Sequence, residues 1–174
     1  HEEVEVPSYA VQEDDQDAEI ARFEDALSLT KNQIEKIKDD VAQNLGEKEA
    51  AIFDAHLMVL EDKAVIDDVV SEVRKSGDNV EQCLHRVTQR YVEYFSQLED
   101  EYLRERSADL KDISRRLLGN LLGATAAGTA FLGEPRILVS EDLSPSDTAS
   151  LDRTKILGIA TDTGGRTSHA VIMA

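Results

Sequence analysis

The sequence predicts an α+β protein in which a four-helix bundle is inserted into a small α/β domain. In four successive runs up to residue 122, apolar residues recur every three or four positions, which is typical of the buried stripe of bundle helices. Small residues and glycines follow at 123–133, and the apolar residues then fall in short strand-like runs. We therefore expect the bundle at residues 12–123 and the α/β domain at residues 1–11 and 124–174.

Local signals bound the four bundle helices. Acidic residues at 13–17 suit the positive end of a helix dipole, and Gly46 ends the first apolar stripe. A second turn at residues 76–79 contains glycine and an asparagine that can cap the next helix. Because the connections are short, neighbouring helices should run antiparallel. The expected helices cover residues 13–45, 47–75, 80–97 and 99–122.

The α/β domain is predicted from short elements on both sides of the bundle. Alternating valines before Pro7 indicate the end of an edge strand. Residues 136–140 and 156–160 are strand-like, and Ser144-Pro145 between them is a helix start. This strand–helix–strand order predicts partly parallel pairing. Because the chain begins with histidine and breaks off inside a predicted helix, we expect a domain truncated at both ends.

The composition argues against several classes of partner. The 174 residues include 36 acidic and 19 basic side chains, for a net charge of −17. Such a surface repels nucleic acids and anionic membranes and favours a basic protein partner. The single cysteine, Cys83, indicates a reducing compartment, so we expect a cytoplasmic protein. We expect neither a membrane span nor a signal peptide.

The last eleven residues, 164–174, hold the most specific chemical pattern. Two glycines precede Arg166, two hydroxyl residues and His169 at the expected start of a helix. Backbone N–H groups at a helix N-terminus bind anions, and the helix dipole favours the neutral imidazole. His169 could then attack a phosphoryl group, while Arg166 and a second cation such as Arg106 neutralise charge. The alternatives are a structural histidine and, for Arg106, an arginine that reaches out of the apolar stripe to pair with a nearby acid.

Other patterns are less specific. Leu57, Met58 and Leu60 lie off the stripe of the second helix. That helix is therefore either buried on two sides or carries an exposed apolar patch for a partner. No Cys/His spacing suits zinc, and no glycine-rich loop with a lysine suits a nucleotide phosphate, so we expect no metal site in this chain.

The closing stretch Gly-Gly-Arg-Thr-Ser-His-Ala-Val-Ile-Met-Ala (164–174) resembles a family signature. It is similar to the phosphohistidine segment of enzyme I of the bacterial sugar phosphotransferase system, a phosphoenolpyruvate–protein phosphotransferase. Pyruvate phosphate dikinase and phosphoenolpyruvate synthase share that signature. Residues 47–62 and 98–123 separate the families, because they resemble the enzyme I helix that docks the carrier HPr and its fourth bundle helix. Residues 142–148 also match an enzyme I segment.

The resemblance implies a carrier-docking bundle and a swivelling phosphohistidine domain, with a role for particular residues. His169 would be phosphorylated through its ε nitrogen. Arg106 would reach towards it from the bundle, and Thr148 would orient the imidazole. The residues expected on the docking surface are Glu47, His56, Met58 and Arg106.

The implied activity needs parts that we do not expect in this chain. In the family, the histidine takes a phosphoryl group from phosphoenolpyruvate and passes it to a histidine of HPr in sugar uptake. The phosphoenolpyruvate-binding domain and its Mg²⁺ site lie C-terminal to this region. One departure is Lys63-Ala64, where the family has an acidic pair. The alternatives are a paralogous regulatory phosphotransfer enzyme with a different carrier and a non-enzymatic helical adaptor.

Overall fold

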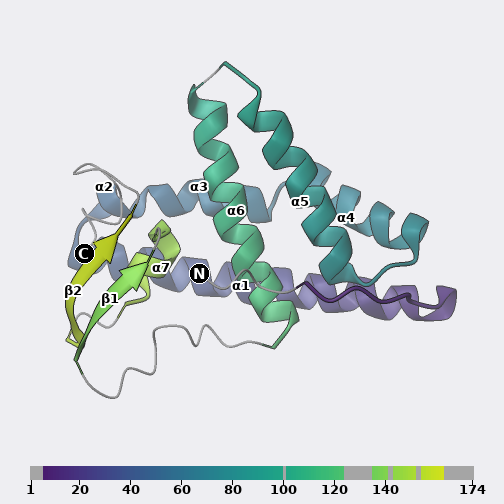
Figure 1. The fold of residues 1–174 in the computed structure, drawn as a ribbon, viewed down its shortest axis with the longest axis horizontal. Helices are drawn as coiled ribbons and strands as arrows, with labels where there is room; N and C mark the ends of the chain where they lie inside the picture. The colour runs from purple at the N-terminus through teal and green to yellow at the C-terminus, as the bar shows by residue number, and fades with distance from the viewer. Residues whose placement is uncertain (1–5, 100, 124–134, 141–142, 152–153, 163–174) are drawn as a thin grey trace.

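The computed structural model describes residues 6–99, 101–123, 135–140, 143–151 and 154–162. The predicted α+β class is confirmed: helices form most of the described chain, and a parallel strand pair lies at one end (Figure 1). A 3₁₀ turn at Glu13–Asp15 precedes the first helix. The elements are α1 (Gln16–Asn44), α2 (Glu47–Ala50), α3 (Ile52–Leu60), α4 (Lys63–Ser76), α5 (Val80–Ser96), α6 (Glu101–Leu121), β1 (Arg136–Ser140), α7 (Pro145–Ala149) and β2 (Ile156–Thr161).

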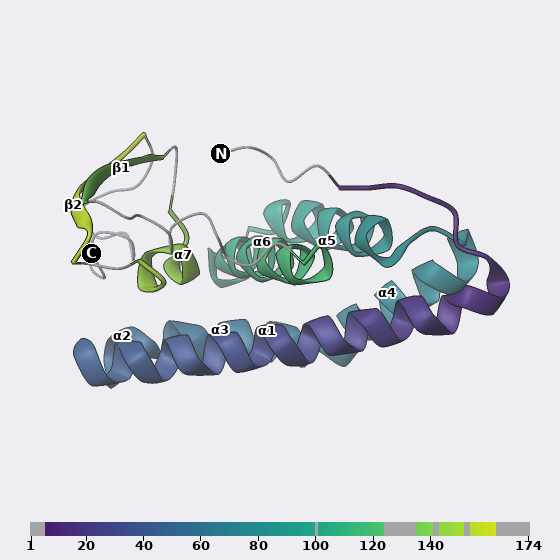
Figure 2. The same ribbon diagram turned by 90° about the horizontal axis from the view of Figure 1, so that it is seen from below.

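The helices form two layers. The long helix α1 lies beside α2, α3 and α4, which return along it in succession, and the α5–α6 hairpin packs across this layer (Figures 1 and 2). Two apolar clusters join the layers. Phe23, Val73 and Leu117 belong to the first, and Ile34, Phe53 and Ile113 to the second. Because α1 and α6 each contribute to both clusters, these two helices connect the bundle along its length.

The single helix predicted for residues 47–75 is wrong, because this stretch forms α2, α3 and α4. The chain leaves helical hydrogen bonding near Ala51 and again at Glu61-Asp62. The Asp62 carboxylate caps α4 by accepting a hydrogen bond from the backbone N–H of Ala64 at 2.9 Å. The break frees α3 from the register of α4, and its extra apolar residues differ in exposure, while a partner site on this helix stays a prediction. Leu60 is buried, whereas Met58 is 55% exposed.

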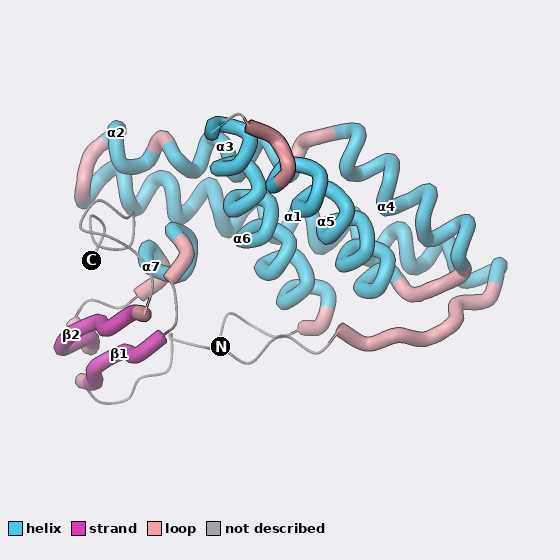
Figure 3. Tube along the Cα trace, turned by 45° about the horizontal axis from the view of Figure 1, so that its top comes forward, coloured by secondary structure: helices cyan, strands magenta, loops and turns pink. Residues whose placement is uncertain are grey.

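The strands pair as the sequence predicts. β1 and β2 are parallel, with Val139 opposite Ala160, and the crossover between them contains α7. This short helix lies between the strand pair and the bundle (Figure 3). Most of the edge strand predicted before Pro7 falls outside the described residues. Val6, its described end, is not in a strand and instead packs against the first core cluster.

One arginine joins the two ends of the bundle. The Arg22 guanidinium donates to the hydroxyl of Tyr9 at 3.3 Å and to the carbonyl of Leu121 at 3.4 Å. It also donates to Glu19 and to the buried Glu81, both at 2.5 Å. The segment that enters the bundle and the helix that leaves it therefore share one cation.

A half-buried ion pair between Arg86 and Asp78 provides a test by pH. Hydrogen bonding from Arg86, at 2.6 Å, lowers the pKa of Asp78 below its ordinary value. A carboxyl group with a depressed folded-state pKa stabilises the fold above its unfolded pKa and loses that effect as pH falls through the folded pKa. Arg86→Gln should therefore raise the Asp78 pKa in an NMR titration. The loss of unfolding free energy of Arg86→Gln relative to the unchanged protein, measured by urea unfolding, should become smaller in acid.

Arg90→Gln is the matched control, because Arg90 lies on the same helix and pairs with Asp68 instead. This variant should leave the Asp78 titration unchanged. An Asp78 pKa that stays depressed in Arg86→Gln would contradict the assigned cause.

Candidate functional site

The structure places part of the predicted site. His169 and Arg166 lie outside the described residues, so their positions stay predictions. Arg106 is half-buried on α6, and Thr148 is on α7. The described part of the predicted site is therefore carried by α6 and α7.

Helix α7 places Thr148 through its own capping chemistry. The Ser144 hydroxyl accepts from the backbone N–H of Asp147 at 3.1 Å, and Pro145 occupies the first helical position. Thr148 is 2% exposed, and its hydroxyl donates to the Ser144 carbonyl at 2.9 Å. A hydroxyl that donates in this way keeps its lone pairs, so it can accept a hydrogen bond from an imidazole N–H.

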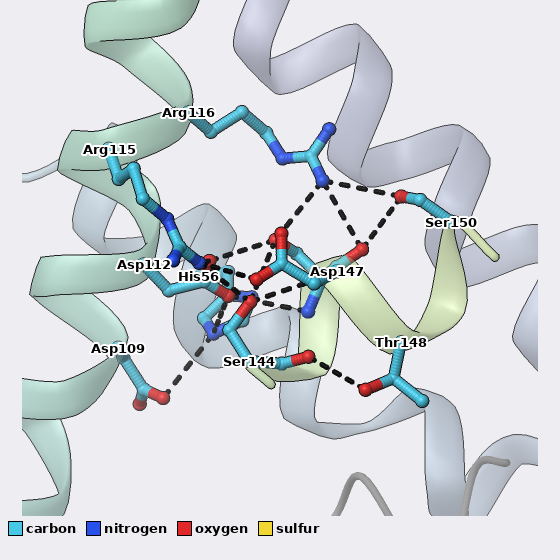
Figure 4. A network of polar contacts seen from close by, with 10 residues as sticks. His56, Asp109, Asp112, Arg115, Arg116, Ser144, Asp147, Thr148 and Ser150 are labelled. Carbon is cyan, nitrogen blue, oxygen red and sulfur yellow. Dashed lines mark hydrogen bonds and ion pairs between the residues drawn. The ribbon is translucent and has the colours of Figure 1, made fainter. Parts of the chain in front are cut away.

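A polar network ties α7 to helix α6 (Figure 4). The Asp112 carboxylate accepts from the Ser146 hydroxyl at 2.9 Å and from the Ser146 backbone N–H at 3.3 Å. Arg115 donates to Asp112 at 3.2 Å, to Asp147 at 2.7 Å and to the Ser144 hydroxyl at 3.1 Å. The bundle helix that carries Arg106 therefore also holds the short helix that carries Thr148.

Arg116 adds a second set of contacts to the same short helix. Its guanidinium donates to the hydroxyl and carbonyl of Ser146, at 3.1 and 3.2 Å, and to the Ser150 hydroxyl at 3.3 Å. Burial lowers the pKa of this guanidinium, while the carboxylates of Asp112 and Asp147 act in the opposite direction. Sequence reasoning missed this network, although two adjacent arginines on a bundle helix are an unusual local signal.

The predicted surface position of His56 is wrong. His56 is 0% exposed and lies between α3 and α6, with Nε2 at 3.3 Å from Asp109 Oδ1 and 3.9 Å from Asp112 Oδ2 (Figure 4). Its ring meets Phe53 edge-on, with centroids 5.4 Å apart. The reason is helical spacing: His56 follows Phe53 by three residues and precedes Leu60 by four, so it shares their buried face. As placed, His56 supports α3 from inside.

Glu47 and Met58 are exposed where the resemblance puts a docking surface. Glu47 begins α2, and Met58 lies on the face of α3 opposite the buried Phe53 and Leu60. An exposed, flexible methionine is suited to contact with a partner. Their role in docking stays a prediction.

The described residues hold neither an arranged group of metal ligands nor a helix that could cross a membrane. No group of three His, Cys, Asp or Glu side chains there is arranged to hold a metal ion. In the same part of the chain, every helix is too short or too polar to cross a membrane.

Comparisons with known proteins give consistent similarities. Residues 1–106 match the family model described as the N-terminal part of PEP-utilising enzymes, and residues 132–174 match the mobile domain of PEP-utilising enzymes. The phosphoenolpyruvate-protein phosphotransferases of Enterococcus faecalis and Bacillus subtilis are 44% and 41% identical over 162 and 160 residues. Each alignment covers 92% of this chain and 28% of the relative, so the chain spans under a third of their length.

Two solved structures have the same fold. An NMR solution structure of Enzyme I matches with a TM-score of 0.82 at 38% identity, over 99% of this chain and 70% of that one. A structure described as the N-terminal domain of Enzyme 1 – Nitrogen matches with a TM-score of 0.74 at 30% identity, over 97% and 68%.

Proposed function

This chain belongs to the PEP-utilising enzymes, as an N-terminal region of the Enzyme I type, and from that premise we propose that it is the phosphohistidine-bearing part of a phosphoenolpyruvate–protein phosphotransferase. His169 accepts a phosphoryl group and passes it to a histidine of the carrier HPr in sugar uptake in the cytoplasm. One structural observation supports this most. Arg106 and Thr148, both expected to act on His169, are on elements that the Asp112 network joins.

The proposed step is a displacement at phosphorus. Thr148 accepts a hydrogen bond from Nδ1–H of His169, which leaves the Nε2 lone pair free to attack. The Nε2–P bond forms as the bond from phosphorus to the donor's leaving atom breaks. Transfer to the carrier is the reverse exchange, in which a carrier imidazole nitrogen takes the phosphoryl group from Nε2. Arg106 and Arg166 compensate the charge on the phosphoryl oxygens.

Docking of the carrier falls to the bundle in this proposal. Glu47 supplies an exposed acidic contact and Met58 an exposed apolar one. Arg106, which is half-buried, contributes both to docking and to phosphoryl transfer. The net charge of −17 favours encounter with a basic carrier surface. In this proposal phosphoenolpyruvate and its Mg²⁺ bind to a separate C-terminal part of the whole protein.

Two alternatives stay open to the same experiment. The likeness to a nitrogen-branch Enzyme I structure makes a regulatory phosphotransfer chain the second candidate, and the departure at Lys63-Ala64 falls at the exposed start of α4. The sugar branch is favoured, because the Enzyme I structure matches with a TM-score of 0.82 at 38% identity, above the 0.74 and 30% of the nitrogen-branch structure. A non-enzymatic adaptor would take up no phosphate at all.

The deciding measurement is phosphoryl uptake by the purified chain. Incubation with ³²P-labelled phospho-HPr should place one acid-labile, base-stable phosphate on the protein, as expected for a phosphoramidate. A parallel reaction with the phosphorylated nitrogen-branch carrier should be much slower. Absence of uptake from both carriers would refute phosphotransfer, and faster uptake from the nitrogen-branch carrier would move the protein to the regulatory branch.

A further inference from the structure

Asp112 is a buried carboxylate, and burying a carboxylate destabilises the fold unless its oxygens accept hydrogen bonds. It lies on the inner face of α6 and is 5% exposed. Both of its oxygens accept hydrogen bonds: Oδ1 from the Ser146 hydroxyl and Arg115, and Oδ2 from the Ser146 backbone N–H. His56 faces the same carboxylate from α3, with Nε2 at 3.9 Å from Oδ2. The carboxylate thus stands where three elements of the fold meet.

The contacts to Ser146 fix α7 both along and around its axis. A helix of five residues has too few internal hydrogen bonds to be stable by itself. Two donors of one residue, the hydroxyl and the backbone N–H, engage the two oxygens of one carboxylate. Thr148 follows Ser146 by two residues in the same turn, so the position of its hydroxyl depends on this anchor.

The partner residues cannot replace that anchor. The Arg115 side chain is 38% exposed, and its ion pairs are open to solvent screening. Arg116 contacts Ser146 and Ser150 through a single nitrogen, Nη2. Among the described residues, only Asp112 has a side chain that accepts hydrogen bonds from both the hydroxyl and the backbone N–H of Ser146.

The anchor also sets a distance within the proposed site. Asp112 and Arg106 are six residues apart on one continuous helix, which corresponds to a rise of about 9 Å. A straight helix of this kind does not change length. Once Asp112 holds α7, Thr148 therefore has a fixed position relative to Arg106.

We propose that Asp112 is a positioning residue for phosphoryl transfer, holding Thr148 on α7 in register with Arg106 on α6 so that His169 meets both. This inference rests on the proposed function and adds to it a residue that touches neither the phosphoryl group nor the imidazole. Asp112 acts through Ser146.

The test is the kinetics of phosphoryl uptake by Asp112→Asn, measured by rapid quench against phospho-HPr concentration. Asparagine keeps the shape but loses one acceptor oxygen and the charge opposite Arg115. The maximal rate should fall about ten- to a hundredfold, as for a small displacement of a positioning group. The KM for phospho-HPr should stay within about twofold, because Glu47 and Met58 are unchanged.

Ser146→Ala is the milder second variant, since it removes only the hydroxyl and leaves the backbone N–H in place. It should lower the maximal rate in the same direction. In the double variant the two effects should not add fully, because both act through the contact between Asp112 and Ser146. Additive effects would show that Asp112 does not act through Ser146 and would overturn the proposal.

Glu81→Gln controls for a purely structural role. Glu81 is also a buried carboxylate, 2% exposed, and accepts from Arg22 and Asn79 away from α7. It should lose stability in urea unfolding while keeping the maximal rate. If Asp112→Asn is folded and transfers as fast as the unchanged protein, the positioning role is refuted while phosphotransfer stands. If the unchanged protein takes up no phosphate, the proposed function has failed first.

Discussion

Replacement of His169 by alanine is expected to abolish phosphoryl uptake from phospho-HPr. The loss should be about a thousandfold or more, because removing the nucleophile of a covalent step leaves no alternative acceptor for the phosphoryl group. The chain has four histidines in all. Among the described ones, His56 is fully buried, which leaves His85 as the partly exposed competitor.

His85→Ala is the control for that competitor. His85 lies on α5 and is not a predicted site residue. Uptake by this variant should match that of the unchanged protein in rate and in amount, measured as acid-labile ³²P per chain. If phosphate persists on His169→Ala, or is lost from His85→Ala, then His169 is not the phosphorylated residue.

The largest effect on stability is expected for Phe53→Ala. Phe53 is 0% exposed in the second core cluster and packs against His56 on the inner side of α3. Deleting a buried phenyl ring costs about 3–5 kcal/mol, which is a large part of the roughly 5–15 kcal/mol that holds a typical domain folded. Urea unfolding followed by circular dichroism measures the loss.

Tyr94→Ala is the matched control, because Tyr94 is also aromatic but 60% exposed. Its substitution should change the free energy of unfolding by about 0.5 kcal/mol or less. A loss below about 1 kcal/mol for Phe53→Ala would mean that α3 is not held by this core. Where the variant remains folded, its affinity for HPr should also fall, since α3 carries Met58.

The parts of the fold that the sequence predicted are those with strong local signals. The stripe of α1, the cap and proline that begin α7, and the strand-like runs of β1 and β2 all have periodicities or turn residues that act over a few positions. The break between α3 and α4 has no glycine or proline. It depends on Asp62 as a cap, and a capping aspartate looks the same in sequence as one on an exposed helix face.

The candidate site also contains residues that local sequence signals could reveal and residues that they could not. His169 could be singled out because glycines, hydroxyls and a histidine stand together in sequence. The anchor between Asp112 and Ser146 joins residues 34 positions apart, across the predicted domain boundary, so periodicity could not reveal it. His56 was a different case. Its position beside Met58 and the family resemblance both favoured the surface, and only the burial of Phe53 and Leu60 in the structure shows that His56 shares their face.

The shared contact of Arg22 with Tyr9 and Leu121 has a consequence for chain entropy. Closing a flexible loop costs more as the loop grows, although only logarithmically. Here Leu121 follows Arg22 by 99 residues, yet one guanidinium holds both ends of the bundle together. The segment that enters the bundle and the end of α6 therefore lie close in space, although they are far apart in the sequence. A segment whose two ends lie together in this way can change in length with little effect on the chain that enters and leaves it.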